Sequence, residues 1–353
     1  MAKIKMINSN IYINDIQKSL AQVPGIIDLY NKKVLITGAT GMIGSALVDA
    51  LVFINNRDNA NITIFASSRS EEKIIKRFGS HLTDRAVYFM PFKDIIKNDN
   101  GNVFDYIIHT AAPANPKEYS IRPVETINSI INSTNALLEL SLNNKNTKFL
   151  YVSSSEVYGV KATSESYKED EYGYVDILNS RSCYPIAKRA AETLCSSYCK
   201  EYGVFATVVR PGHIYGPTMT AQDNRVAADF VRLALDNKDI ILKSKGEQIR
   251  SHCYVTDCVS AILTVLINGK SGKAYNISNA CSISTIKEYA ECVCSLTGRQ
   301  LLFDLPSDQE REAFNPMNNA SLDATQLEEL GWKGIIDLNT GLDHTIKIIK
   351  EIE

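Results

Sequence analysis

The fold is decided by the stretch Val34-Leu-Ile-Thr37-Gly38-Ala-Thr-Gly41-Met42-Ile43-Gly44. A short run of apolar and β-branched residues leads into three glycines at G-x-x-G-x-x-G spacing, and helical periodicity then continues to Ile54. Such a strand–turn–helix unit presents unpaired backbone N–H groups and the positive end of a helix dipole to a pyrophosphate. The pattern therefore predicts a dinucleotide-binding turn, rather than a glycine-rich turn without a ligand. Its residues are Gly38, Gly41, Met42, Ile43 and Gly44.

Short apolar segments and helical segments alternate after this turn. The further predicted strands are 62–66, 86–89, 106–109 and 149–153. Because these segments are apolar throughout, helices should cover both faces of their sheet, as in a parallel sheet. The predicted fold class is therefore α/β, a doubly wound parallel sheet of the Rossmann type.

The two ends of the chain depart from this alternation. Residues 1–31 are predicted to be an N-terminal extension, with a short helix over 13–23 that Pro24-Gly25 stops. We assign 32–216 to the Rossmann domain that binds the dinucleotide. The remainder, 217–353, should form mainly a small α+β substrate-binding domain over the carboxyl edge of the sheet. Its predicted helices are 225–235, 257–267 and 285–296.

Composition and charge exclude several classes of protein. The 353 residues carry 38 basic and 40 acidic side chains, and a net charge of −2 argues against a nucleic-acid partner. No apolar run approaches the ~20 residues of a membrane span, and no hydrophobic secretory segment opens the chain. We therefore expect no membrane partner and a cytoplasmic location. The eight cysteines lack any C-x-x-C spacing, which favours reduced thiols and no metal site.

The residues after the second predicted strand bear on the choice of dinucleotide. An acidic side chain normally binds the adenosine ribose ~20 residues past the glycines, but no carboxylate occurs in 61–70. Ser67, Ser68 and Arg69 stand there instead, and hydroxyls with a guanidinium suit a 2′-phosphate. NADP is therefore possible as well as NAD. The alternative is that Arg69 is only a solvated residue at the start of a helix.

Tyr184 and Lys188 form the first candidate catalytic pair. They are separated by one helical turn, which places both side chains on one helix face, and Pro185 suits the first turn of that helix. An ammonium group beside a phenol should lower the phenol's pKa from ~10 toward neutrality. Tyr184 could then act as a general base that removes a proton from a substrate hydroxyl.

A cluster of hydroxyls and one carboxylate follows the strand 149–153. Ligands bind at the carboxyl ends of strands in open α/β sheets, and Ser154, Ser155 and Glu156 lie there. Ser154 could hydrogen-bond the hydroxyl that Tyr184 deprotonates, and Glu156 could serve as a second proton-transfer group. The alternative interpretation of Glu156 is a solvated loop acid.

These motifs resemble those of the extended short-chain dehydrogenase/reductases that modify nucleotide sugars. The T-G-x-x-G-x-x-G, S-S-x-x-V-Y-G and Y-x-x-x-K motifs span 33–215, and within this group the chain is most similar to UDP-glucuronate decarboxylases. That similarity rests on four segments. They are 109–123, which begins His109-Thr-Ala-Ala-Pro113; Ser155-Glu156-Val-Tyr-Gly159; the stretch from Arg181-Ser-Cys-Tyr184 to Thr193; and Gly216-Pro-Thr-Met219.

The resemblance implies further roles. It implies NAD as cofactor, a nucleotide-diphosphate sugar as substrate and a homodimer. The implied cofactor contacts also include Ser68, Arg69, Asp94, Ile95, Ala111, Ala112, Tyr184, Lys188 and Pro211. The implied substrate contacts are Pro113, His213, Arg225 and Arg250, the two arginines holding the diphosphate. Asp257 should be structural.

Two departures from the decarboxylase pattern concern the substrate. His213 stands where the family's R-x-x-N-x-[YF]-G-P motif has Asn, and 314–318 lacks the Arg that decarboxylases carry ahead of their Leu-Gly-Trp turn. The reactions consistent with the sequence are therefore decarboxylation, 4-epimerisation, and 4,6-dehydration or 5-epimerisation, all through transient oxidation at C4. A non-catalytic NAD(P)-binding regulator is the alternative of a different class.

Overall fold

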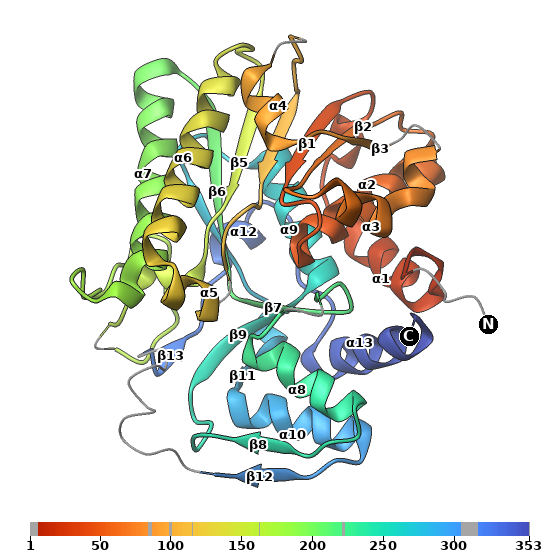
Figure 1. The fold of residues 1–353 in the computed structure, drawn as a ribbon, viewed down its shortest axis with the longest axis vertical. Coiled ribbons are helices and arrows are strands. Elements are labelled where there is room, and N and C mark those ends of the chain that lie inside the picture. Colours follow the sequence, from red (N-terminus) through yellow and green to blue (C-terminus); the bar gives the residue numbers. More distant parts are fainter. Residues whose placement is uncertain are drawn as a thin grey trace.

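The computed structural model describes residues 6–83, 87–98, 101–114, 116–161, 163–220, 223–304 and 317–352. Seven parallel strands form the central sheet in the order β10-β6-β5-β4-β1-β2-β3 (Figure 1). The strands are β1 (Lys33–Thr37), β2 (Thr63–Ser67), β3 (Val87–Phe89), β4 (Tyr106–His109), β5 (Lys148–Val152), β6 (Phe205–Pro211) and β10 (Ala274–Ile277). This sheet confirms the predicted Rossmann-type fold, and the five predicted strands recur in it within a residue or so. Ala86, predicted as the first residue of β3, lies outside the described residues.

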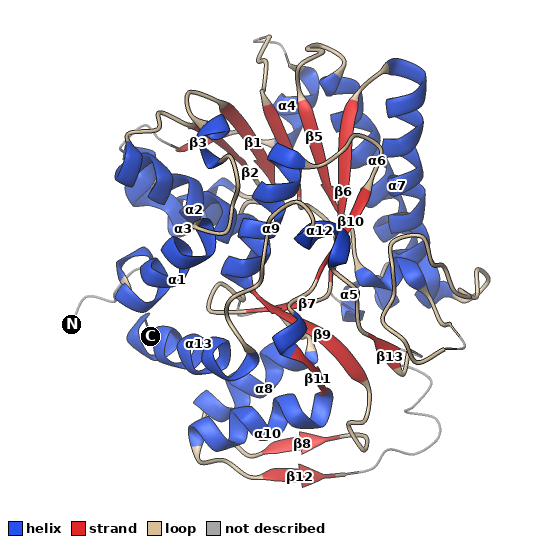
Figure 2. Cartoon of the chain, turned by 180° about the vertical axis from the view of Figure 1, so that it is seen from behind, coloured by secondary structure: helices blue, strands red, loops and turns tan. Residues whose placement is uncertain are grey.

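The sheet is covered on both faces, which explains why its strands are apolar throughout. Val34 and Ile36 of β1 lie in one buried core, whereas Leu35 lies in the other. The first core includes side chains of α2 (Met42–Asp58), α3 (Glu71–Thr83) and α9 (Val255–Asn268). The second includes side chains of α4 (Phe92–Lys97), α6 (Pro123–Ser141) and α7 (Cys183–Tyr202), and Figure 2 shows the helices around the sheet.

A second, smaller layer lies beyond the carboxyl edge of the sheet (Figure 1). Its four-stranded sheet is built around β9 (Ile249–Tyr254), which pairs with β7 (His213–Tyr215), β11 (Ile283–Thr285) and β13 (Asn319–Ala320). The remaining elements there are α8 (Val226–Leu235), β8 (Ile240–Leu242), α10 (Ile286–Thr297), β12 (Leu301–Phe303) and α13 (Leu338–Ile352). The short helices are α5 (Pro116–Ile121), α12 (Thr325–Glu328), and the 3-10 turns η1 (Met6–Asn8), η2 (Ile26–Leu29), η3 (Ser155–Tyr158), η4 (Ser180–Ser182) and η5 (Ala280–Ser282).

The chain past 217 contributes to both layers. After β9 it returns through α9 to add β10 to the edge of the large sheet beside β6. The N-terminal segment is also integrated, because Tyr12, Ile16 and Leu20 of α1 (Asn10–Leu20) are buried in the core that contains α9. This helix begins three residues before the predicted 13–23 and ends three residues earlier.

Three separate parts of the chain meet at Asp257, a completely buried residue of α9. Its Oδ1 accepts a hydrogen bond from Ser19 of the N-terminal helix at 3.0 Å. Its Oδ2 accepts from the backbone N–H groups of Ile335 and Ile336, both at 2.9 Å. This carboxylate therefore ties the N-terminal segment and the chain before α13 to the large domain, in agreement with its predicted structural role.

We expect Asp257→Asn to lower the free energy of unfolding by about 1–3 kcal/mol, because an amide nitrogen must then face a donor in a buried position. Denaturant unfolding followed by circular dichroism would measure the change. Asp343→Asn, which alters only an exposed ion pair with Lys347, is the matched control and should be near neutral. Equal stability of the two variants would contradict the structural role of Asp257.

Candidate active site

The glycine turn has the geometry that a pyrophosphate requires. Gly38 has a φ of +70°, and a Cβ there would lie 2.8 Å from the backbone nitrogen of Ala111. A Cβ on Gly44 would overlap the carbonyl oxygen of Gly38, so the start of α2 approaches the end of β1 too closely for any side chain. Gly41 precedes Met42, the first residue of α2. The turn thus brings the N-terminus of α2 close to the end of β1, and its contact with a pyrophosphate stays a prediction.

The residues predicted to bind the adenosine end lie in different environments. Ser68 shares a hydrogen bond with Thr40 of the glycine turn at 3.1 Å. Arg69 and Asp94 are exposed, whereas Ile95 is 1% exposed and packs in the core beneath the sheet. The other predicted contacts lie at the carboxyl ends of two further strands of the same sheet. Ala111, Ala112 and Pro113 come after β4, which pairs with β1, and Pro211 ends β6.

Tyr184, Lys188 and Ser154 come together at the carboxyl end of β5. The Lys188 ammonium donates to the backbone oxygen of Val152 at 2.7 Å and lies 5.8 Å from the centre of the Tyr184 ring. Ser154 lies two residues past Val152, and its hydroxyl accepts from the N–H of Glu156 at 3.2 Å. Tyr184 and Lys188 share one face of α7, as predicted, and both side chains are buried.

The acid–base properties of this pair differ from the prediction. Burial raises the pKa of Tyr184, the negative charge of Glu156 raises it further, and the Ser154 hydrogen bond lowers it only in part. Burial also lowers the pKa of Lys188 to about 7, against the opposing effect of Glu192. The prediction of a near-neutral phenol is therefore wrong for the protein alone, because desolvation and Glu156 outweigh the groups that lower this pKa, which are Ser154, Arg225 and Arg181. A cationic group bound beside Tyr184 would lower its pKa again.

Glu156 is anchored, which argues against a solvated loop acid. Its Oε2 accepts from Arg181 Nη1 at 2.9 Å and its Oε1 accepts from Arg181 Nη2 at 3.4 Å. The Tyr119 hydroxyl lies 3.5 Å from the same Oε1 and accepts from Arg181 Nη2 at 3.2 Å. The Tyr119 ring stacks on Tyr184, with centroids 5.2 Å apart and planes inclined by 14°. Ser155, also predicted to be catalytic, is instead buried at the first turn of η3.

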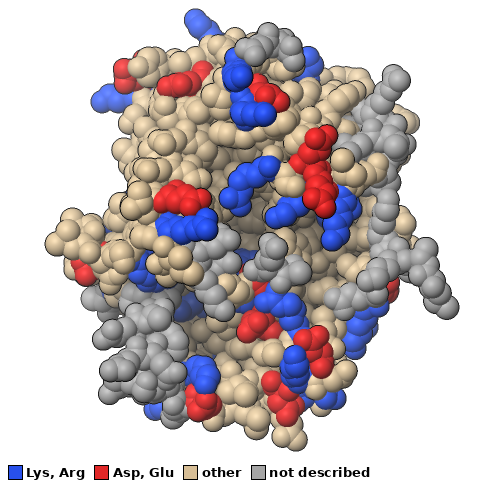
Figure 3. All heavy atoms as spheres, in the orientation of Figure 1, with Lys and Arg blue, Asp and Glu red and all other residues tan. Residues whose placement is uncertain are grey.

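Two of the predicted substrate residues, Arg225 and Arg250, belong to the second layer. Arg225 pairs with Asp223 at 2.6 Å and reaches the sulfur of Met42 in the glycine turn at 3.4 Å. Arg250 is 4% exposed, donates to backbone oxygens, and has no carboxylate partner within the described ranges. Burial lowers the pKa of Arg250 to about 10, an effect that Glu156 opposes. Figure 3 shows one face of the molecule, on which Lys and Arg side chains gather around a central hollow.

His213 lies beside His252, a residue that the sequence interpretation missed. Their rings are 5.9 Å apart on paired strands, and the pKa of each is lowered by burial and then by Arg250. Neither ring nitrogen of His252 has a hydrogen-bond partner in the part of the chain that the structure describes. The signal for His252 was its position two residues after Arg250, on the same strand face.

Arg181 and Tyr119 were also missed as site residues, although both lie in quoted motifs. Arg181 precedes Tyr184 by three residues, nearly one helical turn, which is the spacing that brings side chains together. Tyr119 gave no local signal, because its place beside Tyr184 depends on how α5 packs against η4.

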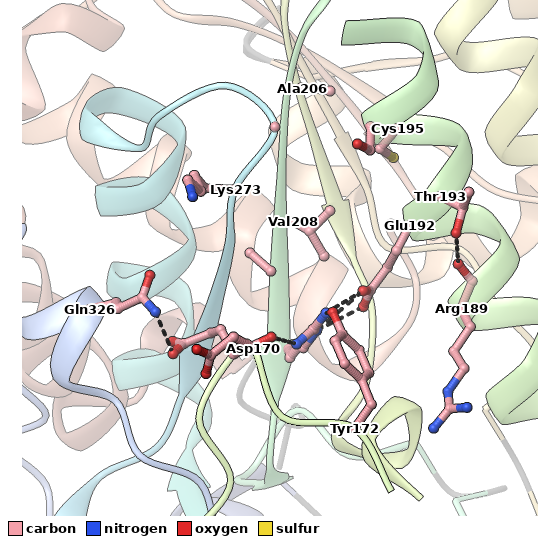
Figure 4. Close-up of a pocket in the computed structure, with 15 residues that line it drawn as sticks. Asp170, Tyr172, Arg189, Glu192, Thr193, Cys195, Ala206, Val208, Lys273 and Gln326 are labelled. Atoms are coloured by element: carbon pink, nitrogen blue, oxygen red, sulfur yellow. Dashed lines mark hydrogen bonds and ion pairs between the residues drawn. The ribbon is translucent and has the colours of Figure 1, made fainter. Parts of the chain in front are cut away.

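A cavity of about 630 Å³ lies away from these residues, between α7, β6 and β10 (Figure 4). Its lining includes Arg210 and Glu192, which form an ion pair 2.6 Å long. Arg210 also donates to Tyr158, Tyr172 and the backbone oxygen of Glu169, so protein groups occupy every arm of the guanidinium. We assign no ligand to this cavity.

The described side chains include residue types that serve as ligands of metal ions. No group of three His, Cys, Asp or Glu side chains within the described ranges could hold a metal ion, and all eight cysteines are free thiols. No helix among the residues described is long and apolar enough to cross a membrane.

The fold and the site together define the class of the protein: it is a Rossmann-type enzyme with a glycine turn and a Ser/Tyr/Lys set at the same edge of the sheet. The model of the NAD dependent epimerase/dehydratase family matches residues 34–278. The chain belongs to that family, which confirms the resemblance seen in the sequence. It is 30% identical to UDP-glucuronic acid decarboxylase 1 of Xenopus tropicalis, over 97% of this chain and 79% of the relative. It is 31% identical to UDP-glucuronic acid decarboxylase 6 of Arabidopsis thaliana, over 88% and 87%.

Solved structures have the same fold at lower identity. The UDP-glucuronic acid 4-epimerase of Bacillus cereus, in complex with UDP-glucuronic acid and NAD, matches with a TM-score of 0.77 and 22% identity, over 91% of this chain and all of that one. The UDP-glucose 4-epimerase of Thermotoga maritima, with UDP-glucose, matches with a TM-score of 0.76 and 24% identity, over 90% and 99%.

We expect Gly44→Ala to weaken NAD binding about tenfold or more, because a Cβ there overlaps the Gly38 carbonyl. Titration of the purified chain with NAD and NADP would measure both affinities. Gly79→Ala is the matched control, since the nearest atom to its Cβ is Ile75 Cγ2 at 4.0 Å. Failure of the unaltered chain to bind either dinucleotide would contradict the site, and tight NAD without NADP binding would show that Arg69 makes no 2′-phosphate contact.

We expect Tyr184→Phe to lower turnover ~10²–10⁴-fold and to leave NAD affinity within error, because only the proton acceptor is lost. Steady-state kinetics and the same titration would separate the two effects. Tyr202→Phe, at the exposed end of the same helix, should match the unaltered chain. Turnover at the normal rate in Tyr184→Phe would assign the base to another residue.

Proposed function

We propose that this chain is a redox-neutral nucleotide-sugar enzyme of the UDP-glucuronate-decarboxylase type, with NAD as cofactor. The support is the family, the curated decarboxylase relatives over most of the chain, and the Ser/Tyr/Lys set beneath a dinucleotide turn. The observation that carries the proposal is Glu156, a carboxylate anchored beside Tyr184. A 4-epimerase needs no second proton-transfer group, whereas chemistry at C5 does.

The chain's residues can account for the reaction in order. The glycine turn would hold the dinucleotide's pyrophosphate, and when bound its nicotinamide accepts and later returns a hydride. Tyr184 takes the proton of the C4 hydroxyl, with Ser154 hydrogen-bonded to the same oxygen and Lys188 fixed one turn away. The C4 ketone then weakens the C5–C6 bond. CO₂ leaves, the bonding pair enters an enolate with the C4 oxygen, and Glu156 relays a proton from solvent to C5. Tyr184 then gives its proton back to the C4 oxygen as the hydride returns to C4.

The cations of the site suit a nucleotide-diphosphate substrate. Arg225 lowers the pKa of Tyr184, and Glu156 raises the pKa of Arg250, which supports a place for both arginines in the same site. Guanidinium groups bind phosphate oxygens in pairs, and Arg250 has no protein carboxylate to compete with a ligand among the described residues. The identity of the nucleotide, the homodimer and the cytoplasmic location stay predictions.

The test is turnover in D₂O of UDP-glucuronate and a panel of neutral nucleotide sugars, with products analysed by mass. Decarboxylation predicts loss of CO₂ and one deuterium at C5, whereas 4-epimerisation predicts an isomer of unchanged mass. Dehydration predicts loss of water. Absence of any product, with NAD bound, would favour the regulator over every enzyme hypothesis.

We expect Glu156→Gln, a nearly isosteric change, to stall the reaction after oxidation at C4. Absorbance of reduced nicotinamide and a 4-keto nucleotide sugar should then accumulate in a single turnover. Glu165→Gln, an exposed acid of a nearby loop, is the control and should form product normally. Normal product formation by Glu156→Gln would make 4-epimerisation the better account.

A further inference from the structure

We infer that Arg181 is a positioning residue for the proton transfer at C5: its two-point contact with the Glu156 carboxylate holds that side chain toward the sugar, beside Tyr184. This inference rests on the proposed function, because it assumes that Glu156 acts at C5. The inference gives a role to Arg181, which belongs neither to the glycine turn nor to the Ser/Tyr/Lys set.

The geometry of the ion pair supports the role. Arg181 comes from η4 and Glu156 from η3, so their contact joins two segments 25 residues apart. Both Nη atoms of the guanidinium face the carboxylate, at 2.9 and 3.4 Å, and two-point contact fixes orientation as well as distance. The side chains are 24% and 21% exposed, so solvent screens this pair less than a surface pair.

Tyr119 connects the ion pair to the catalytic phenol. The Arg181 guanidinium lies 5.4 Å from the centre of the Tyr119 ring, and the same ring stacks on the ring of Tyr184. The Tyr119 hydroxyl contacts both members of the pair. Glu156 therefore holds a fixed place relative to Tyr184, the group that acts at C4. The second proton must move at C5, which is the next carbon of the sugar.

The charged and titratable groups that face Glu156 come from four elements. They are Arg181 of η4, Tyr119 of α5, Cys183 and Tyr184 of α7, and Arg250 of β9. Of the residues that the structure describes, only Arg181 makes a direct ion pair with the carboxylate. Arg181 also lowers the pKa of Tyr184, but burial and Glu156 act on that phenol more strongly. Removal of Arg181 should therefore affect the C5 step far more than the C4 step.

The experiment compares Arg181→Met, Arg181→Lys, Glu156→Gln and the Arg181→Met/Glu156→Gln double variant, each with NAD and the substrate identified in D₂O. Arg181→Met should reduce nicotinamide in a single turnover at the normal rate yet form product ~10²-fold more slowly. Arg181→Lys should recover part of that loss, because an ammonium restores the charge without the two-point contact. The double variant should be no slower than Glu156→Gln, because both changes disrupt the same ion pair and so abolish the same function. Arg122→Met, which removes an exposed ion pair with Glu125, is the matched control.

Two kinetic results would overturn the inference while leaving the proposed function intact. One is normal product formation by Arg181→Met when Glu156→Gln stalls. The other is loss of nicotinamide reduction itself in Arg181→Met, which would place Arg181 in the C4 step. Normal product formation by Glu156→Gln would instead overturn the proposed function and the inference with it.

A measurement without cofactor or substrate checks the pair itself. Denaturant unfolding of the two single variants and the double variant gives a coupling free energy between Arg181 and Glu156. The inference predicts a coupling that 1 M salt reduces only slightly, because the pair is partly buried. Additive effects of the two changes would overturn it.

Discussion

One hydrogen bond sets the arrangement of the site, the bond from the Lys188 ammonium to the backbone oxygen of Val152. It ties α7 to the last residue of β5 at 2.7 Å, in a position where both partners are buried. Tyr184 lies one helical turn before Lys188, and Ser154 and Glu156 lie two and four residues after Val152. The bond therefore holds the proposed C4 base opposite the residues that would complete its chemistry.

Burial shifts the pKa values of Lys188 and Tyr184, and these shifts determine the acid–base chemistry of the site. It lowers the pKa of Lys188 to about 7 and raises that of Tyr184, so the protein alone does not poise the phenol as a base. The positive charge of an oxidised nicotinamide beside Tyr184 would favour phenolate. On this account the base becomes competent only when the dinucleotide is bound, which couples proton removal at C4 to the presence of the hydride acceptor.

The sequence predicted those parts of the structure that depend on local spacing. The Gly38–Gly44 turn, the strands on either side of it and the Tyr184–Lys188 pair are each specified within a few residues. It did not predict the return of β10 to the large sheet, because the pairing partner of a short apolar strand is a tertiary choice. Tyr119 and His252 were missed for the same reason. The predicted pKa of Tyr184 was wrong because the spacing of residues in the sequence does not reveal how deeply a side chain is buried. The segment 314–318, whose lack of an Arg bears on the substrate, falls mostly outside the described residues.

The central claim is that the sugar is oxidised and reduced again at C4 within one turnover. The most direct test is turnover of the substrate carrying deuterium at C4, in ordinary water, with the product analysed by mass and NMR. The account predicts that the deuterium leaves C4 and returns to it, so the product retains the label at that carbon. Loss of the label to solvent, or turnover without any kinetic isotope effect and without nicotinamide bound, would contradict it.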